Sequence, residues 1–104
     1  MTTLYIAGPM TGLKDFNRSA FNDAEKKLRA AGYEVLNPAR QPDGLDRREY
    51  MRRGVADVLE ADGIATLWDW VNSKGAFAEV ALAEAVGVKI WGVDAWLTGA
   101  EVPF

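Results

Sequence analysis

The chain of 104 residues contains neither cysteine nor histidine. These two absences exclude disulfide bonds, thiolate chemistry, zinc sites built from Cys or His, and every catalytic triad that uses an imidazole. Any catalysis would therefore depend on carboxylates, hydroxyl groups, lysine or arginine side chains and backbone amides.

Long apolar runs and an excess of positive charge are also missing. No stretch reaches the roughly 20 apolar residues of a membrane span, and the N-terminus has no basic segment ahead of a hydrophobic one. The net charge of −3 argues against binding to a nucleic-acid polymer, because a phosphate backbone requires a basic surface. We therefore expect a cytoplasmic protein with no membrane partner.

Apolar residues make up 49% of the chain, as in an ordinary globular protein, and the length suits one core. Residues 1–104 are therefore predicted to form a single domain. Strands are predicted at 3–7, 33–37, 63–67 and 88–91, and helices from Asp15 or Asn17 to 31, at 46–61 and at 75–86. This alternation indicates βαβ units and a parallel sheet in an α/β fold. The tail is compatible with a helical turn at 94–98 and a docking segment at 101–104.

The helical periodicity also predicts which side chains are buried. In the first helix the inward positions are Phe16, Ala20, Phe21, Ala24, Leu28 and Ala31, and the solvent face carries Asp23, Glu25, Lys26, Lys27 and Arg29. In the second helix the inward positions are Tyr50, Met51, Val55, Val58 and Leu59. Its arginines, Arg47, Arg48, Arg52 and Arg53, are predicted to be solvated, and one of them near the site would help to hold a phosphate.

Ligands of open parallel sheets bind beyond the carboxyl ends of the strands, so we expect loops 8–15, 37–46 and 68–75 to lie together. Glu79 follows the last of these loops, on a small and apolar stripe of its helix where a charge is expensive. It is the predicted nucleophile or base, and the nearby helix N-terminus is expected to keep it ionised. Glu84 lies farther from the loops.

The loops offer polar groups beside Glu79. Gly8-Pro9-Met10-Thr11-Gly12 matches neither a dinucleotide fingerprint nor a Walker A motif, so it is either a plain tight turn or a turn whose amides and Thr11 hydroxyl approach a sugar or phosphate. Ser73 and Gly75 begin the third helix, where an anion is favoured and Ser73 can also be an N-cap. Asp69 is a second candidate carboxylate. Its neighbour Trp68 either stacks on a base or packs in the core or an interface.

Several segments together resemble the nucleoside 2-deoxyribosyltransferase superfamily. They are Tyr5-Ile-Ala-Gly-Pro-Met-Thr-Gly12, Gly32-Tyr-Glu-Val-Leu-Asn-Pro38, Ala61-Asp-Gly-Ile-Ala65, Ser73-Lys-Gly-Ala-Phe-Ala-Glu79 and Ala83-Glu-Ala-Val-Gly87. The likeness is greatest to small members from phage and bacterial genomes, and relatives include deoxynucleoside 5′-monophosphate N-glycosidases. The resemblance implies a flavodoxin- or Rossmann-like three-layer sandwich with a parallel sheet of four to five strands.

The resemblance further implies cleavage or transfer at the N-glycosidic bond of a 2′-deoxynucleoside or its 5′-monophosphate. A glutamate at the position of Glu79 would attack C1′ and form a covalent deoxyribosyl-enzyme, as in a retaining glycosidase. No metal or organic cofactor is implied. The partner is a small nucleoside or nucleotide, and neighbouring subunits usually complete each site, so a homodimer or higher homo-oligomer is expected.

On the same pattern Tyr5 lies against the sugar, Gly8 lets the ligand approach the backbone, and Ser73 and Gly75 line the sugar or 5′-phosphate side. The sequence departs from the pattern where relatives carry an aspartate in the second helix, because Gly54 stands there. Asp57, about one turn later, is a partial replacement. A mid-helix glycine costs about 1 kcal/mol relative to alanine, so a close contact is expected at Gly54, with ligand or another subunit.

Three hypotheses follow from these residues. The first is a deoxyribosyl transferase or hydrolase that uses Glu79. The second is a nucleotide-binding or nucleotide-sequestering protein that has lost turnover, a reading that Gly54 favours. The third is a structural or partner-binding domain in which Glu79 has no chemical role.

Overall fold

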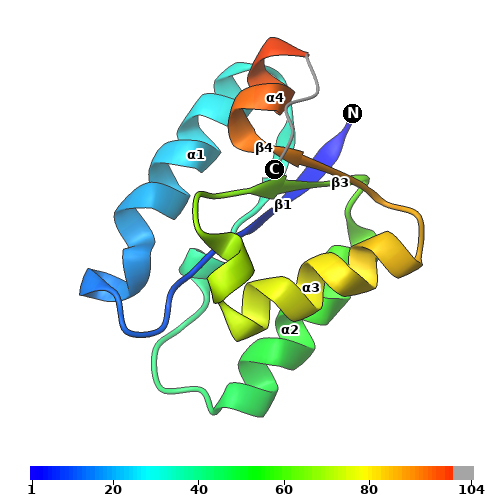
Figure 1. Ribbon diagram of the computed structural model, residues 1–104. Helices are drawn as coiled ribbons and strands as arrows, with labels where there is room; N and C mark the ends of the chain where they lie inside the picture. The colour runs from blue at the N-terminus through cyan, green and yellow to red at the C-terminus, as the bar shows by residue number, and fades with distance from the viewer. Residues whose placement is uncertain (100–104) are drawn as a thin grey trace.

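In a computed structural model, residues 1–99 are described and form a four-stranded sheet with helices on both faces (Figure 1). The elements are β1 (Thr3–Ala7), η1 (Lys14–Asn17), α1 (Arg18–Ala30), β2 (Glu34–Leu36), η2 (Pro38–Arg40), α2 (Arg47–Glu60), β3 (Gly63–Thr66), η3 (Trp70–Asn72), α3 (Lys74–Ala85), β4 (Lys89–Gly92) and α4 (Val93–Thr98), where η marks a short 3-10 helix. The predicted three-layer α/β sandwich is confirmed, with four strands.

The strands lie in the order β2-β1-β3-β4, and every neighbouring pair is parallel. The chain begins in the interior of the sheet, adds β2 on one side and then crosses to β3 on the other. The direction of winding therefore reverses at β1, and ligands of such sheets bind at the carboxyl ends of the strands beside this reversal.

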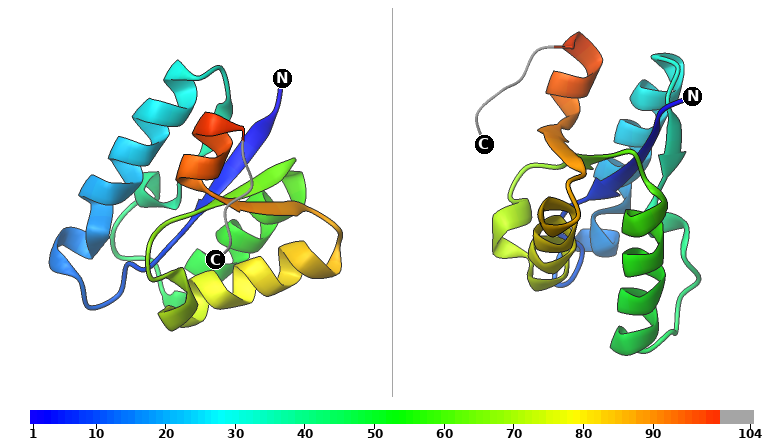
Figure 2. Two further views of the ribbon diagram at one scale, coloured as in Figure 1. Left: turned by 45° about the horizontal axis from the view of Figure 1, so that its top comes forward. Right: turned by 90° about the vertical axis from the view of Figure 1, so that its right-hand side faces the viewer.

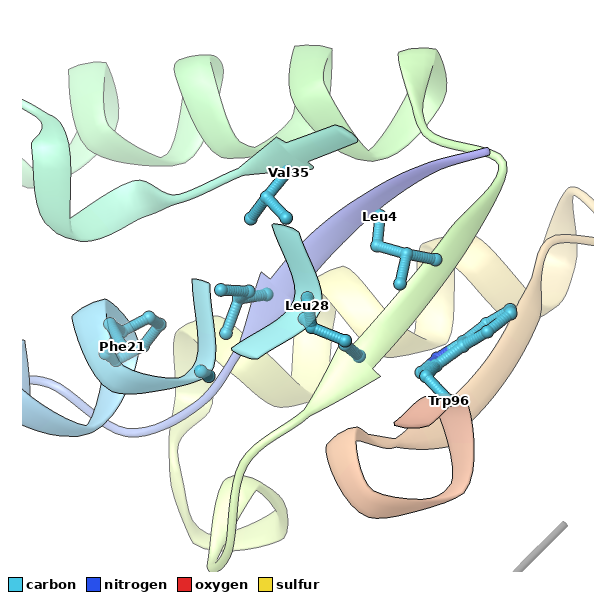
Figure 3. Close-up of a cluster of buried hydrophobic side chains, with 8 residues drawn as sticks. Leu4, Phe21, Leu28, Val35 and Trp96 are labelled. Carbon is cyan, nitrogen blue, oxygen red and sulfur yellow. The ribbon is translucent and has the colours of Figure 1, made fainter. Parts of the chain in front are cut away.

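One face of the sheet is covered by α1 and α4, and the other by α2 and α3 (Figures 1 and 2). On the first face Leu4, Phe21, Leu28 and Trp96 are buried together (Figure 3). A Cβ on Gly63 would lie 2.5 Å from the Trp96 ring, so this strand must begin with glycine. Large side chains fill this layer.

The layer between the sheet and α2 and α3 is built from smaller residues. Its buried members are Tyr5, Ala7, Val58, Ala61, Ile64, Ala76, Val80 and Ala83. Because helix-to-sheet separation depends on side-chain size, the alanines allow α3 to pack closely on the strands. This brings side chains of α3 within reach of β1.

The structure corrects the predicted start and face of the first helix. Asp15, Phe16 and Asn17 adopt left-handed backbone angles, with φ of 50°, 53° and 61°, and α1 begins only at Arg18. The Asn17 side chain does not cap the helix but donates a hydrogen bond to the Pro9 carbonyl at 3.0 Å. Phe16 is therefore not a core residue and is 50% exposed.

Other predicted faces also differ. Glu25, expected in solvent, is only 3% exposed, whereas Ala31 is exposed. In α2 the buried line is Gly54 and Val58, and Tyr50 and Leu59 are exposed. The helical turn near 94–98 is confirmed as α4, and the proposed docking segment 101–104 lies outside the described residues. Within residues 1–99, no helix is both long and apolar enough to span a bilayer.

Candidate active site

A pocket of about 500 Å³ lies at the carboxyl end of β1, between the β1–α1 loop, the loop after β2, one side of α2 and the start of α3. Of the site residues predicted from the sequence, those that line it are Tyr5, Gly8, Met10, Thr11, Asp57, Ser73, Gly75 and Glu79. The predicted loops 8–15 and 37–46 therefore share a pocket with the end of the third predicted loop, at Ser73 and Gly75, and with the first turns of α3.

Glu79 is held at this pocket by a single hydrogen bond. Its side chain is buried, with the residue 9% exposed, and its Oε2 accepts a 2.7 Å hydrogen bond from the Tyr5 hydroxyl. No residue within 1–99 donates to Oε1, yet no fully buried polar side-chain atom there lacks a partner, so Oε1 is not fully buried. One oxygen of Glu79 is thus oriented by Tyr5, and the other is left for a reacting atom.

Gly54 provides the space that the Glu79 carboxylate occupies. A Cβ built on Gly54 would lie 2.1 Å from Glu79 Oε2 and 3.2 Å from the Tyr5 hydroxyl. The close contact predicted at this glycine is therefore present, but its partner is the carboxylate of the same chain, which neither a ligand nor a subunit is needed to explain. The missing side chain brings α2 against the Tyr5–Glu79 pair.

Burial raises the pKa of Glu79 to about 7, opposed by the hydrogen bond from Tyr5 and reinforced by the charge of Asp57. The expectation that the helix N-terminus keeps Glu79 fully ionised is wrong. Glu79 is the sixth residue of α3, and the effect of a helix terminus fades beyond the first turn. Near neutral pH both the acid and the carboxylate are populated.

The pKa values of the two neighbouring ionisable groups, Tyr5 and Asp57, are raised as well. Burial raises the pKa of Tyr5 well above its usual value, and the negative charge of Glu79 raises it further. Tyr5 therefore remains a hydrogen-bond donor at all physiological pH values. Burial also raises the pKa of Asp57, with a smaller contribution from Glu60.

Ser73 and Gly8 line the pocket, but helix capping and packing already explain why serine and glycine occupy these positions. Ser73 is the N-cap of α3, and its Oγ accepts a hydrogen bond from the Ala76 amide at 3.3 Å. A Cβ on Gly8 would lie 2.8 Å from Leu67, so packing already requires glycine there. Gly75 is different, since a Cβ would meet only the Met51 sulfur at 3.8 Å.

Three predicted residues, Pro9, Trp68 and Asp69, line a different groove, which also contacts α1 and the start of α4. The chain turns away after β3, because Asp69 has a left-handed φ of 67° and begins η3. Asp69 accepts a hydrogen bond from the Asn72 side chain, and Trp68 is 90% exposed. The structure does not bring these three residues to Glu79.

The pocket also contains residues that the sequence did not indicate. Arg18 of α1 pairs with Asp15 at 2.7 Å and with Asp43, which joins the two loops at the mouth of the pocket. One arginine of α2 was expected near the site, and of the four it is Arg47 that lines the pocket. Phe16, Tyr50 and Met51 contribute apolar surface to the lining, and Gln41 contributes an amide. No local sequence pattern predicts that Arg18 and Asp43 line the pocket, because their ion pair joins segments that are distant in the sequence.

Within residues 1–99 no group of three or more acidic side chains is placed to hold a metal ion. Three carboxyl groups line the pocket, those of Asp43, Asp57 and Glu79, and Glu79 is the one that the Tyr5 hydroxyl orients.

Comparison with protein families now identifies the class. A family described as "Domain of unknown function (DUF4406)" matches residues 2–92, and the chain belongs to this family. Comparison with curated protein sequences finds no match.

Solved structures with the same fold include the 2-deoxyribosyltransferase of Bacillus psychrosaccharolyticus, with 17% identity, a TM-score of 0.69, and coverage of 86% of this chain and 70% of that one. A 2-desoxiribosyltransferase from Leishmania mexicana gives 19% identity and a TM-score of 0.69, over 88% of this chain and 63% of the other. The CMP N-glycosidase of Clostridium botulinum gives 18% identity and a TM-score of 0.65, over 98% and 86%. These likenesses confirm the α/β fold implied by the resemblance, which this chain shares with two deoxyribosyltransferases and an N-glycosidase.

Proposed function

We propose that this protein cleaves or transfers the N-glycosidic bond of a 2′-deoxynucleoside or its 5′-monophosphate, with Glu79 as nucleophile. The observation that carries the proposal is the buried carboxyl of Glu79, with Oε2 held by Tyr5 and Oε1 free of protein partners within residues 1–99. The fold shared with two deoxyribosyltransferases and an N-glycosidase supports the same chemistry.

In the first step Glu79 Oε1 forms a bond to C1′ while the bond between C1′ and the base nitrogen breaks. The electron pair of that bond leaves with the base, which takes a proton from Asp57. Asp57 is assigned this role because it lines the same pocket, and burial shifts its pKa in the direction that favours proton donation. The product is a glycosyl ester of Glu79, as in retaining glycosidases.

In the second step water, or the ring nitrogen of a second base, attacks C1′ from the face that the first base left. The ester bond to Glu79 breaks, and Asp57 takes the proton of the attacking group. Tyr5 favours this step because its hydroxyl stabilises the carboxylate that departs. The 2.7 Å contact requires no rearrangement of the protein for that purpose.

The remaining pocket residues have simpler proposed roles. Thr11, Ser73 and the half-buried Gly75 line the pocket and are assigned to bind a sugar hydroxyl or 5′-phosphate, and Arg47 adds a positive charge to the same pocket. The exposed apolar side chains of Trp68, Val71 and Phe77 support the prediction of a homodimer or higher homo-oligomer. A cytoplasmic location also stays a prediction.

A binding protein without turnover is the second candidate function. Gly54 favours it, because the aspartate that relatives carry in the second helix has no room here beside Glu79. Such a protein would use the same pocket for a nucleotide but would leave the glycosidic bond intact.

The test is chromatographic detection of free base after incubation with deoxynucleosides and their 5′-monophosphates. Glu79→Gln is the control, since it keeps the shape and the hydrogen bond from Tyr5 but removes the nucleophile. Base release by the wild type alone, with a deoxyribosyl adduct on Glu79 detected by mass spectrometry, is the expected result. Binding without release would establish the second candidate, and release by Glu79→Gln would show that another group acts.

A further inference from the structure

The helix α3 is largely apolar on every side, although the rest of the described chain covers only one side of it (Figure 1). Its buried residues are Ala76, Glu79, Val80 and Ala83. The opposite side is exposed and consists of Lys74, Phe77, Ala78, Ala81, Glu84 and Ala85. At about 100° of turn per residue, these positions form one continuous stripe. A helix that is apolar all round is typical of one that is buried on all sides, so a further element is expected over this stripe.

The centre of the stripe combines one bulky side chain with small ones. Phe77 is 54% exposed, yet its ring stacks on Trp70 of η3, with the ring centroids 6.1 Å apart. This contact holds the Phe77 ring in place before any partner arrives. Ala81 lies about one turn further along the exposed side, and its small side chain allows a second helix to approach closely. The stripe thus offers both a projecting ring and a position that can accept one.

The ends of the stripe carry opposite charges. Lys74 is the first residue of α3, and Glu84 lies near its end. Both side chains are exposed, and neither has an ionic partner within residues 1–99. Each charge is therefore available to a partner of opposite sign.

The spacing of these residues fits a second copy of the same helix. In a symmetric dimer, residue i of one copy contacts residue j of the other, and j contacts i. For two antiparallel helices, i and j must lie at equal distances on either side of one position. Lys74 and Glu84 have position 79 as their midpoint, and so do Phe77 and Ala81. A single twofold axis therefore pairs lysine with glutamate and phenylalanine with alanine, each pair occurring twice.

Other arrangements of two α3 helices bring like charges together. A symmetric parallel pair places each residue against its own copy, so that Lys74 meets lysine and Glu84 meets glutamate. An antiparallel pair shifted to bring Phe77 against Val86 places Lys74 opposite Lys89. Like charges in contact destabilise a pairing and exclude it in favour of the complementary one.

We propose that α3 forms the interface of a homodimer, packed antiparallel on α3 of a second copy, with Lys74 paired to the partner's Glu84. The inference assigns a surface to the expected homodimer and does not depend on the proposed reaction. Ser73 and Gly75, which flank Lys74, line the pocket. The partner's Glu84 therefore lies beside the edge of the pocket that α3 forms.

Sedimentation velocity over a dilution series tests the charge pairing. Lys74→Glu and Glu84→Lys each replace two attractive contacts by two repulsive ones, so each is expected to raise the dimer dissociation constant about 30-fold at low salt. In an equimolar mixture of the two variants, one chain is acidic and the other basic at both positions. A heterodimer with nearly wild-type affinity is the expected result, and only this pairing of positions produces it.

Three further variants serve as controls. Ala81→Arg places a long charged side chain at the centre of the stripe and is expected to give a monomer. Lys26→Glu and Glu60→Lys make the same charge changes at exposed positions of α1 and α2, and are expected to leave dimerisation unchanged. Circular dichroism verifies that each variant is folded, and since all of these positions are exposed, folding is expected to be retained.

A monomeric wild type, or a dimer that Ala81→Arg leaves intact, would overturn the interface. Dimers weakened by Ala81→Arg without a heterodimer in the mixture would overturn the pairing of Lys74 with Glu84. Tighter dimerisation by Lys74→Glu would also overturn it, in favour of the register that places Lys74 opposite Lys89. Base release by the wild type is measured separately, so none of these outcomes bears on the proposed reaction.

Discussion

Three residues far apart in the sequence, Tyr5, Gly54 and Glu79, converge on one pair of carboxylate oxygens. Tyr5 supplies the donor, Glu79 the carboxyl, and Gly54 the absence of a side chain where Oε2 lies. The helical glycine is explained by this contact, since an alanine would be favoured by about 1 kcal/mol on helix propensity alone. At the scale of single residues, the position of the Glu79 carboxylate depends on the space left by Gly54 as well as on the hydrogen bond from Tyr5.

Gly54→Ala tests this interpretation. The new methyl group would meet the far end of a flexible side chain, Glu79 Oε2 at 2.1 Å, and not backbone. We therefore expect the fold to survive, with a free energy of unfolding within about 1 kcal/mol of wild type. Glu79 must move, and base release is expected to fall by a factor of about 100. Wild-type turnover by Gly54→Ala would show that this contact does not position the nucleophile.

The pKa of Glu79 also predicts how stability depends on pH. The folded protein holds the Glu79 proton up to about pH 7, whereas an ordinary glutamate loses it near 4.5. Between these values the native state binds more protons, so this group lowers stability as pH rises. With about 1.4 kcal/mol per pKa unit, the loss reaches about 3 kcal/mol above pH 7.

Glu79→Gln removes this loss. Urea denaturation at about pH 5 and about pH 8 should find the variant similar to wild type at the lower pH and more stable by up to about 3 kcal/mol at the higher one. The pH profile of kcat/KM should rise through about pH 7 as the nucleophile ionises. Parallel stability curves for the two proteins would contradict the raised pKa.

At the scale of elements, the loop after β2 is positioned by a buried carboxylate on α1. Glu25 accepts hydrogen bonds from Arg40, Arg29 and Asn37 at 2.7–2.9 Å. Arg40 contributes most to a pKa of Glu25 lowered to about 2, with Asn37 and Arg29 acting in the same direction. These hydrogen bonds hold residues 37–41, which follow β2, against α1 on the other face of the sheet.

Glu25→Gln should weaken the hydrogen bonds that Arg29 and Arg40 donate to this side chain. The arginines are partly exposed and can turn into water, so we expect a loss of about 1–3 kcal/mol in unfolding free energy at neutral pH. The difference should shrink as pH falls from about 4.5 toward 2, because the stabilisation is lost when Glu25 is protonated.

Glu34→Gln is the matched control for this measurement. Glu34 pairs with the same Arg29 at 3.6 Å but is exposed, so its loss is expected to be below about 0.5 kcal/mol. Equal effects of the two substitutions would show that burial of Glu25 contributes nothing.

At the scale of the whole molecule, the two faces of the sheet are covered by side chains of different size. The face under α1 and α4 holds the large side chains of the core, including Trp96, whose Nε1 donates to the Ile64 carbonyl at 2.8 Å. The face under α2 and α3 holds the small residues and the Tyr5–Glu79 pair. The largest core side chains and the candidate site thus lie on opposite faces of the sheet.

Trp96→Ala is expected to show this separation. It removes a large buried side chain and should lower the free energy of unfolding by about 3–5 kcal/mol. Ligand binding at temperatures where the variant is folded should be retained, because Trp96 does not line the pocket. A loss of affinity in proportion to the loss of stability would show that the two faces are coupled.

Much of this architecture could be predicted from local patterns. Apolar runs placed β1 and β3, alternation with helices indicated the parallel sheet, and the apolar neighbours of Glu79 marked it as a buried carboxylate. The misplacement of Asp69 has an identifiable cause. Asp69 was grouped with Glu79 because both lie near the end of β3, yet a left-handed residue turns its segment to the other side.

The sequence by itself determined the layers, the position of Glu79 and the exclusion of imidazole and thiol chemistry, since composition and periodicity are local properties. Tertiary structure alone decided that Tyr5 meets a carboxylate 74 positions away and that Gly54 leaves room for it. It also decided the pKa of Glu79 and which side of α3 is left exposed. These features depend on the order of the strands and on which helices pack against each other. The periodicity of apolar residues indicates the buried face of a helix, but it does not indicate which element packs against that face.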